Sequence, residues 1–399
     1  MSNRIEHLET PGGNARARGL GIPFAGEPGR FNAITDVAGV EVGHVTLIEG
    51  DGPLIAGEGP VRTGVSAILP RGRDSALACA AGRATLNGNG ELTGSHWIDE
   101  VGAIASPILL TNTFAVGECH RGIVDWFTQR GSADPAWIFP VVGETYDGYL
   151  NDIAGSHVGR RHALEAIAGA HSGPIEEGSV GGGTGMNSYG LKGGVGTASR
   201  VVNYRETQFH VAAYVQSNFG ARPELTIAGV NVGQMLSTPN PMQDGEWGLT
   251  PGSGSIIVVV ATDAPVLPHQ CSALARRAGV GLARTGTTGS HHSGDIFLAF
   301  STANTGALTS IHPKDPGAVG RPSLEQMTYL PWGEMDPFYA AAAHAVEEAV
   351  VNALVANHSM TGRDGHVSPA LPHAELQEIL RRNAISLSNV NLGGNSNEH

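Results

Sequence analysis

The stretch Leu249-Thr-Pro-Gly-Ser-Gly-Ser255-Ile-Ile-Val-Val-Val260 joins a Gly/Ser/Pro turn directly to a fully apolar strand whose first residue is a serine. A serine at the start of a buried strand has its hydroxyl at the end of the sheet, facing any cleft that lies there. Gly254 can adopt backbone angles that are closed to other residues. If the Gly254–Ser255 bond were cut, Ser255 would carry a nucleophilic hydroxyl and a free amine to act as its base. Taken alone, the pattern is more typical of an ordinary turn before a strand.

Around this stretch the chain alternates between predicted strands and predicted helices. The strands are rich in Val, Ile and aromatic residues and are predicted over 40–48, 67–69, 108–110, 209–216, 225–230, 256–261 and 296–301. Helices are predicted over 117–129, 153–167, 268–278, 336–356 and 373–383. Mixed helices and strands joined by glycine-rich turns favour a layered α/β or α+β domain.

The helix over 336–356 has the clearest sequence pattern. It begins at Asp336-Pro337, a capping residue followed by a proline at the first helical position. Alanine dominates the rest of the segment, and small residues surround most of the helix. We therefore expect this helix to pack closely against another helix or a sheet in an inner position.

Composition and charge favour a cytoplasmic globular enzyme. The 399 residues are 41% hydrophobic and 15% charged, which is enough for a large core, and the net charge is −13. This acidic balance argues against nucleic acid and anionic membranes as partners. The N-terminus is polar and acidic where a signal peptide needs an apolar run, and no stretch approaches the roughly 20 apolar residues of a membrane span.

Cysteine and glycine usage adds two further expectations. Cys79, Cys119 and Cys271 are far apart without CxxC spacing, so neither a disulfide framework nor a zinc site is indicated. The 57 glycines, about twice the average share, are spread through the chain and indicate many tight turns in a strand-rich fold. The ends, residues 1 to about 17 and from about 388 to 399, are expected to be poorly ordered.

Two glycine-rich stretches do not fit a nucleotide-binding loop. Gly178-Ser-Val-Gly-Gly-Gly-Thr-Gly-Met-Asn-Ser-Tyr-Gly190 lacks the Lys-Ser/Thr ending of a P-loop, and Gly193-Gly-Val-Gly-Thr197 lacks the GxGxxG spacing of a dinucleotide fingerprint. A turn that lines an active site with backbone amides is the better interpretation. No organic cofactor is therefore predicted.

A second cluster of chemically useful residues lies at 289–302. Ser293 and Asp295 are two residues apart at a loop-to-strand junction, so the strand period of two turns both side chains to the same face. Asp295 could accept a hydrogen bond from Ser293 and orient its hydroxyl toward a nucleophile. The alternative is a simple turn that caps the strand. His291 and His292 are adjacent and have no third ligand at metal-site spacing, so no metal site is predicted.

Seven motifs succeed one another along the chain: Asp36-Val-Ala-Gly-Val-Glu-Val-Gly-His44, Arg62-Thr-Gly-Val-Ser-Ala-Ile-Leu-Pro70, Asn87-Gly-Asn-Gly-Glu-Leu-Thr-Gly94, Gly143-Glu-Thr-Tyr-Asp-Gly-Tyr-Leu-Asn151, Gly178-Ser-Val-Gly-Gly-Gly-Thr-Gly-Met186, Gly254-Ser-Ile-Ile-Val-Val and Ser293-Gly-Asp-Ile-Phe-Leu-Ala-Phe-Ser-Thr302. Together they resemble the DmpA-type aminopeptidases, a group that includes the L-aminopeptidase/D-amidase/D-esterase and the β-peptidyl aminopeptidases. The similarity covers about residues 19–372, and seven co-linear motifs are far more specific than any one of them.

This resemblance implies a fold and a processing step. The fold is an α+β, four-layer αββα sandwich, similar to the N-terminal nucleophile hydrolases but with distinct connectivity. The chain would be a single catalytic domain that cuts itself between Gly254 and Ser255, giving an α chain of 1–254 and a β chain of 255–399. A tetramer of αβ units is also implied.

The resemblance also implies roles for individual residues. Ser255 would be the nucleophile, Ser293 and Asp295 would assist it, and Asn218 would stabilise the oxyanion together with a backbone amide. The β-peptidyl branch tends to carry Glu where this chain has Asp295, which leaves the effect of the shorter side chain open. Glu144 and Tyr146 would lie near the amino end of the substrate.

The implied function is that of an aminopeptidase that releases small N-terminal residues (Gly, Ala, D-Ala or β-amino acids such as β-Ala) from short peptides, amides and esters, through an acyl-enzyme and without a cofactor. The preference among α-, β- and D-residues is left open, because it depends on pocket residues such as Trp137. Two alternatives are an acyl transferase of the same fold and an unprocessed binding protein. The serine at 255 argues against the transferase, whose relatives use threonine.

Overall fold

The computed structural model describes residues 5–130, 138–241, 252–308 and 324–388. Its framework is two stacked β-sheets. The first has four strands, in the order β1 (Glu41–Glu49), β2 (Val61–Leu69), β5 (Ile108–Asn112) and β6 (Val141–Thr145). The second has six strands, in the order β4 (Ala103–Ile104), β3 (Cys79–Gly88), β14 (Ser293–Ser301), β13 (Gly252–Thr262), β10 (Thr207–Gly220) and β9 (Gly194–Tyr204).

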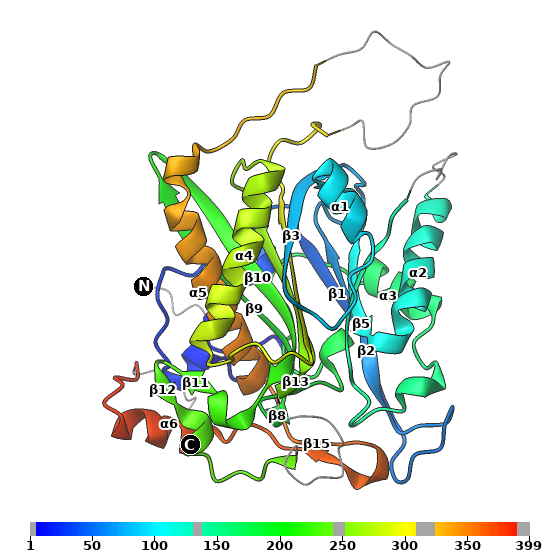
Figure 1. Cartoon of the computed structure of the whole chain (residues 1–399), viewed down its shortest axis with the longest axis vertical. Coiled ribbons are helices and arrows are strands. Elements are labelled where there is room, and N and C mark those ends of the chain that lie inside the picture. The colour runs from blue at the N-terminus through cyan, green and yellow to red at the C-terminus, as the bar shows by residue number, and fades with distance from the viewer. Residues whose placement is uncertain (1–4, 131–137, 242–251, 309–323, 389–399) are drawn as a thin grey trace, which may run out of the picture.

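Helices cover the outer face of each sheet (Figure 1). On the six-stranded sheet, α4 (Pro268–Arg284) packs on β3 and β14, while α5 (Asp336–Val355) packs on β9 and β10. On the four-stranded sheet, α2 (Val116–Gln129) packs on β5 and β6, and α3 (Arg160–Ala168) packs on β1 and β2. The layers therefore have the order helix, sheet, sheet, helix, which confirms the predicted α+β αββα sandwich.

Shorter elements complete the chain at the margins of these layers. They are α1 (Ser95–Val101), α6 (His373–Arg382) and three two-stranded pairs formed by β7 (Asn187–Ser188) with β8 (Leu191–Lys192), β11 (Thr226–Ile227) with β12 (Val230–Asn231), and β15 (Met360–Thr361) with β16 (Val367–Ser368). No helix in the described ranges is both long enough and apolar enough to cross a membrane.

Strand β13 shows why its sequence is apolar without interruption. Ile256, Val258 and Val260 belong to the core cluster beneath α4 and α5. Ile257 and Val259 belong to the cluster that both sheets share. A strand buried on both faces needs apolar residues at every position. Because side chains alternate along a strand, Ser255 points to the same face of the sheet as Ile257, toward the space between the two sheets.

Among the strands longer than two residues, the sequence did not predict β3, β6 and β9, which are either short or rich in small residues. β9 begins Gly-Val-Gly-Thr-Ala-Ser, with little of the β-branched and aromatic content that marks a strand. The reason is packing against α5. A Cβ on Gly196 would lie 1.9 Å from the carbonyl oxygen of Ala349, so the strand and the alanine-rich helix approach too closely for larger side chains. The expected inner position of this helix is thereby confirmed.

Two predicted elements were wrong in detail. The strand expected over 225–230 is instead the hairpin of β11 and β12, because Ala228 and Gly229 both adopt positive φ (52° and 79°) as a two-residue reversing turn requires. The helix expected over 153–167 is a short 3₁₀ turn, Ile153–Gly155, followed by α3 from Arg160. The remaining predicted strands and helices are present with shifted ends.

The N-terminal segment was expected to be poorly ordered up to about residue 17, and from residue 5 this expectation was wrong. Arg16 is buried and donates to Glu177 at 2.6 Å and to the carbonyl oxygen of Thr197 at 2.9 Å. Arg18 forms an ion pair with Glu348 of α5 at 2.7 Å. Charged residues that look like a solvated tail in sequence thus bind buried carboxylates. At the other end, residues 389–399 lie outside the described residues.

Glu348 is the centre of this buried network. Its carboxylate also pairs with Arg200 at 2.7 Å and accepts from the Asn32 side chain at 2.6 Å. Burial alone would raise the pKa of Glu348, but the guanidinium groups of Arg200 and Arg18 outweigh it and lower the pKa to about 2. A carboxylate whose pKa is lowered on folding stabilises the protein above its unfolded pKa, and that contribution is lost as the pH falls through the folded value.

We expect Glu348→Gln to lower the free energy of unfolding at pH 7 by about 3–5 kcal/mol, because it leaves the buried guanidinium of Arg200 and the partly buried one of Arg18 without their anion. The difference from wild type should shrink as the pH falls from 4.5 toward about 2, where the wild-type carboxylate also becomes protonated. Urea titrations across this range measure it. Glu378→Gln, which removes an exposed ion pair with Arg382, is the control and should cost less than about 1 kcal/mol. A difference that does not change with pH would contradict the assignment.

Candidate active site

Ser255 lies where three neighbouring strands reach the same edge of the six-stranded sheet. β10 runs antiparallel to β13, so Asn218, two residues before the end of β10, is paired with Ser255. β14 runs parallel to β13, so its first residues lie at the same level, with Ser293 opposite Gly254 and Gly294 opposite Ser255. Opposite strand directions on the two sides thus bring together residues that are far apart in sequence.

Gly254 occupies a position that only glycine can fill. Its φ is 151°, and a Cβ there would lie 1.9 Å from the carbonyl oxygen of Asn218. The hydroxyl of Ser255 donates to the carbonyl oxygen of Gly254 at 2.5 Å, and Ser255 is only 4% exposed. The hydroxyl is therefore held against the peptide group that the sequence analysis marked as the cleavage site.

Ser293 and Asp295 form the hydrogen bond that their spacing predicted. Ser293 Oγ donates to Asp295 Oδ1 at 2.6 Å, and both residues are buried. The second carboxylate oxygen accepts from the Asn87 side chain at 3.0 Å, and the same amide nitrogen lies 3.0 Å from the carbonyl oxygen of Ser290. Burial raises the pKa of Asp295, while the hydrogen bonds from Ser293 and Asn87 lower it.

Asn87 is a residue whose place in the site sequence reasoning missed. It stands in a glycine-rich motif that was used only for the family resemblance, and β3, the strand that carries it, was not predicted. In the structure β3 pairs with β14 so that Asn87 lies opposite Asp295. An asparagine directly before Gly-Asn-Gly was the available indication, but without the strand pairing it had no partner.

Asn218 is held at both ends of its side-chain amide. Its Oδ1 accepts from the backbone N–H of Asn187 at 2.8 Å, and its Nδ2 donates to the carbonyl oxygen of Tyr146 at 3.0 Å. The side chain is buried beside Ser255. An amide nitrogen carries two hydrogens, so one N–H donor remains for another acceptor.

Glu144 lies near the end of β6, on the other sheet, and is 3% exposed. Its Oε1 accepts from the backbone N–H of Glu91 at 2.9 Å, and its Oε2 accepts from the Thr113 hydroxyl. A Cβ on Gly90 would lie 3.2 Å from Glu144 Oε1 and 3.3 Å from the Cα of Gly294. The loop around Gly90 therefore links Glu144 to the start of β14 beside Ser255. Burial raises the pKa of Glu144.

Of the two remaining predicted site residues, Tyr146 and Trp137, the structure describes only Tyr146. Tyr146 is 37% exposed, and its hydroxyl lies close to the backbone of Gly148. Its backbone carbonyl reaches Asn218, so the chain that carries it borders the site. Trp137 lies outside the described residues.

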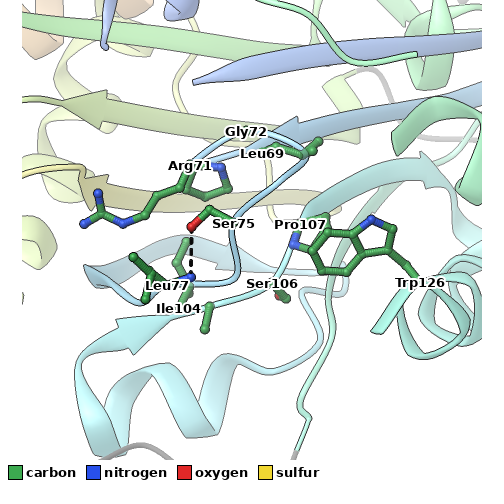
Figure 2. Close-up of a pocket in the computed structure, with 11 residues that line it drawn as sticks. Leu69, Arg71, Gly72, Ser75, Leu77, Ile104, Ser106, Pro107 and Trp126 are labelled. Carbon is green, nitrogen blue, oxygen red and sulfur yellow. Dashed lines mark hydrogen bonds between the residues drawn. The ribbon is translucent and has the colours of Figure 1, made fainter. Parts of the chain in front are cut away.

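A small cavity elsewhere in the fold is separate from this site. Its volume is about 10 Å³. Figure 2 shows the side chains that line it, among them Trp126 and Leu77. It adjoins Leu69 of β2, at the end of the four-stranded sheet opposite Glu144. In the part of the chain that is described, no group of three or more His, Cys, Asp or Glu side chains is arranged to hold a metal ion.

Comparison with known proteins finds close similarity along nearly the whole chain. A model of peptidase family S58 matches residues 32–368. The β-peptidyl aminopeptidase BapA of Sphingosinicella microcystinivorans is 50% identical over 375 residues, which cover 92% of each chain. Among solved structures, the L-aminopeptidase D-Ala-esterase/amidase of Ochrobactrum anthropi superposes with a TM-score of 0.85 at 44% identity, covering 94% of this chain and 99% of that one. A β-aminopeptidase of Burkholderia sp. gives a TM-score of 0.83 at 45% identity, covering 92% and 98%.

Proposed function

Because the chain belongs to peptidase family S58 and is an aminopeptidase, we propose that it is a precursor that cuts itself between Gly254 and Ser255 and then uses Ser255 as its nucleophile. The observation that carries this proposal is the contact between the Ser255 hydroxyl and the Gly254 carbonyl oxygen at 2.5 Å. The α chain would be 1–254 and the β chain 255–399.

The proposed self-cleavage proceeds through an ester intermediate. The Ser255 hydroxyl attacks the carbonyl carbon of Gly254 and its proton passes to the Ser255 nitrogen. The C–N bond breaks, the nitrogen leaves as an amine, and an ester joins Gly254 to the Ser255 oxygen. Water then hydrolyses the ester, which leaves a carboxylate on Gly254 and both a free amine and a free hydroxyl on Ser255. The positive φ of Gly254, confined beneath the Asn218 carbonyl, keeps the peptide in a conformation that other residues do not adopt.

In turnover the new α-amine of Ser255 is the base. Its unperturbed pKa is near 8, so at pH 7 a useful fraction is neutral and accepts the hydroxyl proton as the oxygen attacks the substrate carbonyl. The free N–H of Asn218 donates to the oxyanion that forms, a contact worth about 3 kcal/mol. The acyl group is then transferred from Ser255 to water.

Ser293 and Asp295 orient the base. Gly254 is paired with Ser293, so the amine released at Ser255 lies next to the Ser293 hydroxyl. Because Ser293 donates its proton to Asp295, its oxygen is left to accept from the amine, whose lone pair is thereby directed at the hydroxyl of Ser255. Asp295 acts through Ser293 and is a positioning residue.

Glu144 gives the site its requirement for a free amino terminus. Each of its oxygens accepts one hydrogen bond from the protein, and a carboxylate oxygen can accept two. The remaining lone pairs suit the ammonium group of a substrate in a poorly solvated position. Similarity to relatives named β-peptidyl aminopeptidases supports small β-amino acids, such as β-Ala, as the N-terminal residues released. A cytoplasmic location and a tetramer of αβ units complete the proposal.

Intact mass spectrometry under denaturing conditions tests the processing. Purified protein should give fragments of about 26 and about 15 kDa, the 41.2 kDa mass divided in proportion to chain length, with Ser255 as the new N-terminus. Ser255→Ala should give only the full-length mass, whereas Ser253→Ala, a serine two residues earlier in the same strand, should still be cut. A wild-type chain that stays whole would disprove self-cleavage and favour the unprocessed binding protein.

Glu144→Gln should selectively weaken recognition of the substrate ammonium group. A hydrogen bond to a charged group is worth about 1.5–3 kcal/mol, so kcat/KM for β-Ala-p-nitroanilide should fall about 10–100-fold, mainly through KM. The selectivity for this substrate over its N-acetylated form should fall by the same factor. Glu100→Gln, an exposed acid on α1, is the control. If both substrates lose the same factor in Glu144→Gln, the carboxylate has a structural role instead.

Asn87→Ala should shift the pH dependence of kcat. The Asn87 hydrogen bond lowers the pKa of Asp295, which burial raises, so its removal should raise that pKa further. The Ser255 amine sets the upper part of the acid limb of kcat, and protonation of Asp295 steepens its lower part, so this lower part should move to higher pH in the variant. Asn89→Ala removes a hydrogen bond from the same loop to the His292 carbonyl oxygen and should leave the limb where it is. An unmoved limb in Asn87→Ala would show that Asp295 does not set it.

A further inference from the structure

A fully buried lysine lies close to the candidate active site. Lys192, in the short strand β8, has no exposed surface. Its ammonium group donates to the backbone carbonyl oxygens of Met186 at 2.8 Å and Gly193 at 2.7 Å, and lies 3.5 Å from that of Gly183. Its own backbone is fixed, since its N–H donates to the carbonyl oxygen of Pro369 at 2.7 Å. A buried ammonium is costly, so its position needs an explanation.

The peptide group between Met186 and Asn187 connects this lysine to Asn218. Its carbonyl oxygen accepts from Lys192 Nζ, and its N–H donates to Asn218 Oδ1 at 2.8 Å. A cation on the carbonyl side of a peptide polarises it and makes its N–H a stronger donor, because hydrogen bonds in a chain reinforce one another in a poorly solvated interior. The Asn218 amide is polarised in turn, which strengthens its own N–H donors.

The other hydrogen-bond partner of the Asn218 side chain, the Tyr146 carbonyl oxygen, is also connected to Lys192, through Asp147. The Tyr146 carbonyl oxygen, which accepts from Asn218 Nδ2, is the oxygen of the peptide that precedes Asp147. Asp147 is fully buried and accepts from Asn151 at 2.9 Å through Oδ1, while Oδ2 has no hydrogen-bond partner among the described residues. Its charge interacts with that of Lys192. Both peptides that grip Asn218 are therefore attached to one buried pair of opposite charges.

We propose that Lys192 is a positioning residue for the oxyanion donor: through the Met186–Asn187 peptide it fixes and polarises the side-chain amide of Asn218. This inference rests on the proposed function, in which Asn218 stabilises the oxyanion. It adds a residue outside the candidate catalytic set, between the two glycine-rich stretches for which a turn lining the site with backbone amides was expected.

Burial shifts the pKa values of both Lys192 and Asp147. It lowers the pKa of Lys192 to about 7, against the attraction of Asp147, and raises the pKa of Asp147 to about 7. The groups nearest to the ammonium are the carbonyl oxygens of Gly193 and Met186, at 2.7 and 2.8 Å. The geometry therefore directs the effect of Lys192 to the peptide that contacts Asn218.

Steady-state kinetics of Lys192→Met, with β-Ala-p-nitroanilide as substrate, test the proposal. We expect kcat to fall roughly 10–100-fold with KM nearly unchanged, since the contact is made only in the transition state and a misplaced donor retains part of its effect. The inhibition constant of 2-aminoethylboronic acid, whose tetrahedral adduct with Ser255 mimics the oxyanion, should rise by the same factor. Lys192→Gln, which keeps an uncharged N–H donor, is measured in parallel and serves where Met prevents folding.

A double-mutant cycle distinguishes action through Asn218 from general damage. If Lys192 acts through Asn218, adding Lys192→Met to Asn218→Ala should lower kcat little further. Independent, multiplying losses would overturn the proposal, as would a wild-type kcat in either folded Lys192 variant. Arg200→Met, which removes another fully buried cation from the Glu348 network, should lower stability and leave the inhibition constant unchanged. Failure of the proposed function itself would appear separately, as wild-type protein that neither splits nor turns over.

Discussion

The site depends on the register of β13 between an antiparallel neighbour and a parallel one. Because β10 runs the opposite way, it brings Asn218, two residues before its end, to the level of Ser255. Because β14 runs the same way, it brings its first residue, Ser293, to the level of Gly254. A slip of one residue would turn Ser255 to the other face of the sheet and separate all three. The sheet order is therefore as much a part of the site as the side chains.

The segments of the site also have to approach closely, and glycine residues allow their backbones to do so. At Gly254 the Asn218 carbonyl occupies the place of a side chain, and at Gly294 a Cβ would lie 2.3 Å from the Asn89 carbonyl oxygen. The second contact lets the loop of Asn87–Gly90 lie over β14, where it reaches both Asp295 and Glu144. The same principle holds at the periphery, where Gly196 admits α5. The high glycine content of the chain thus reflects backbone contacts more than loop flexibility.

How much the sequence could predict depends on the range of each interaction. Local patterns predicted the apolar strand after Ser255, the alanine-rich helix and the hydrogen bond between Ser293 and Asp295, because each depends on neighbouring residues. The family resemblance correctly indicated the layered fold. The strands of small residues, the partner role of Asn87 and the burial of Lys192 depend on the segments that lie across the sheet or beneath a loop. No local pattern distinguishes Lys192 from a solvated lysine in a glycine-rich turn.

The hydrogen-bond partners of Asp295 show how an aspartate fits at this position. Asp295 is two residues from Ser293 on the same strand, and one oxygen reaches that hydroxyl at 2.6 Å while the other meets Asn87 at 3.0 Å. With both oxygens engaged, the carboxylate is held in one orientation against the Ser293 hydroxyl. The short side chain of aspartate is long enough to reach both the hydroxyl two residues away and the amide on the neighbouring strand. Aspartate at 295 and asparagine at 87 therefore form one unit, in which the amide fixes the acid and the acid fixes the hydroxyl beside Ser255.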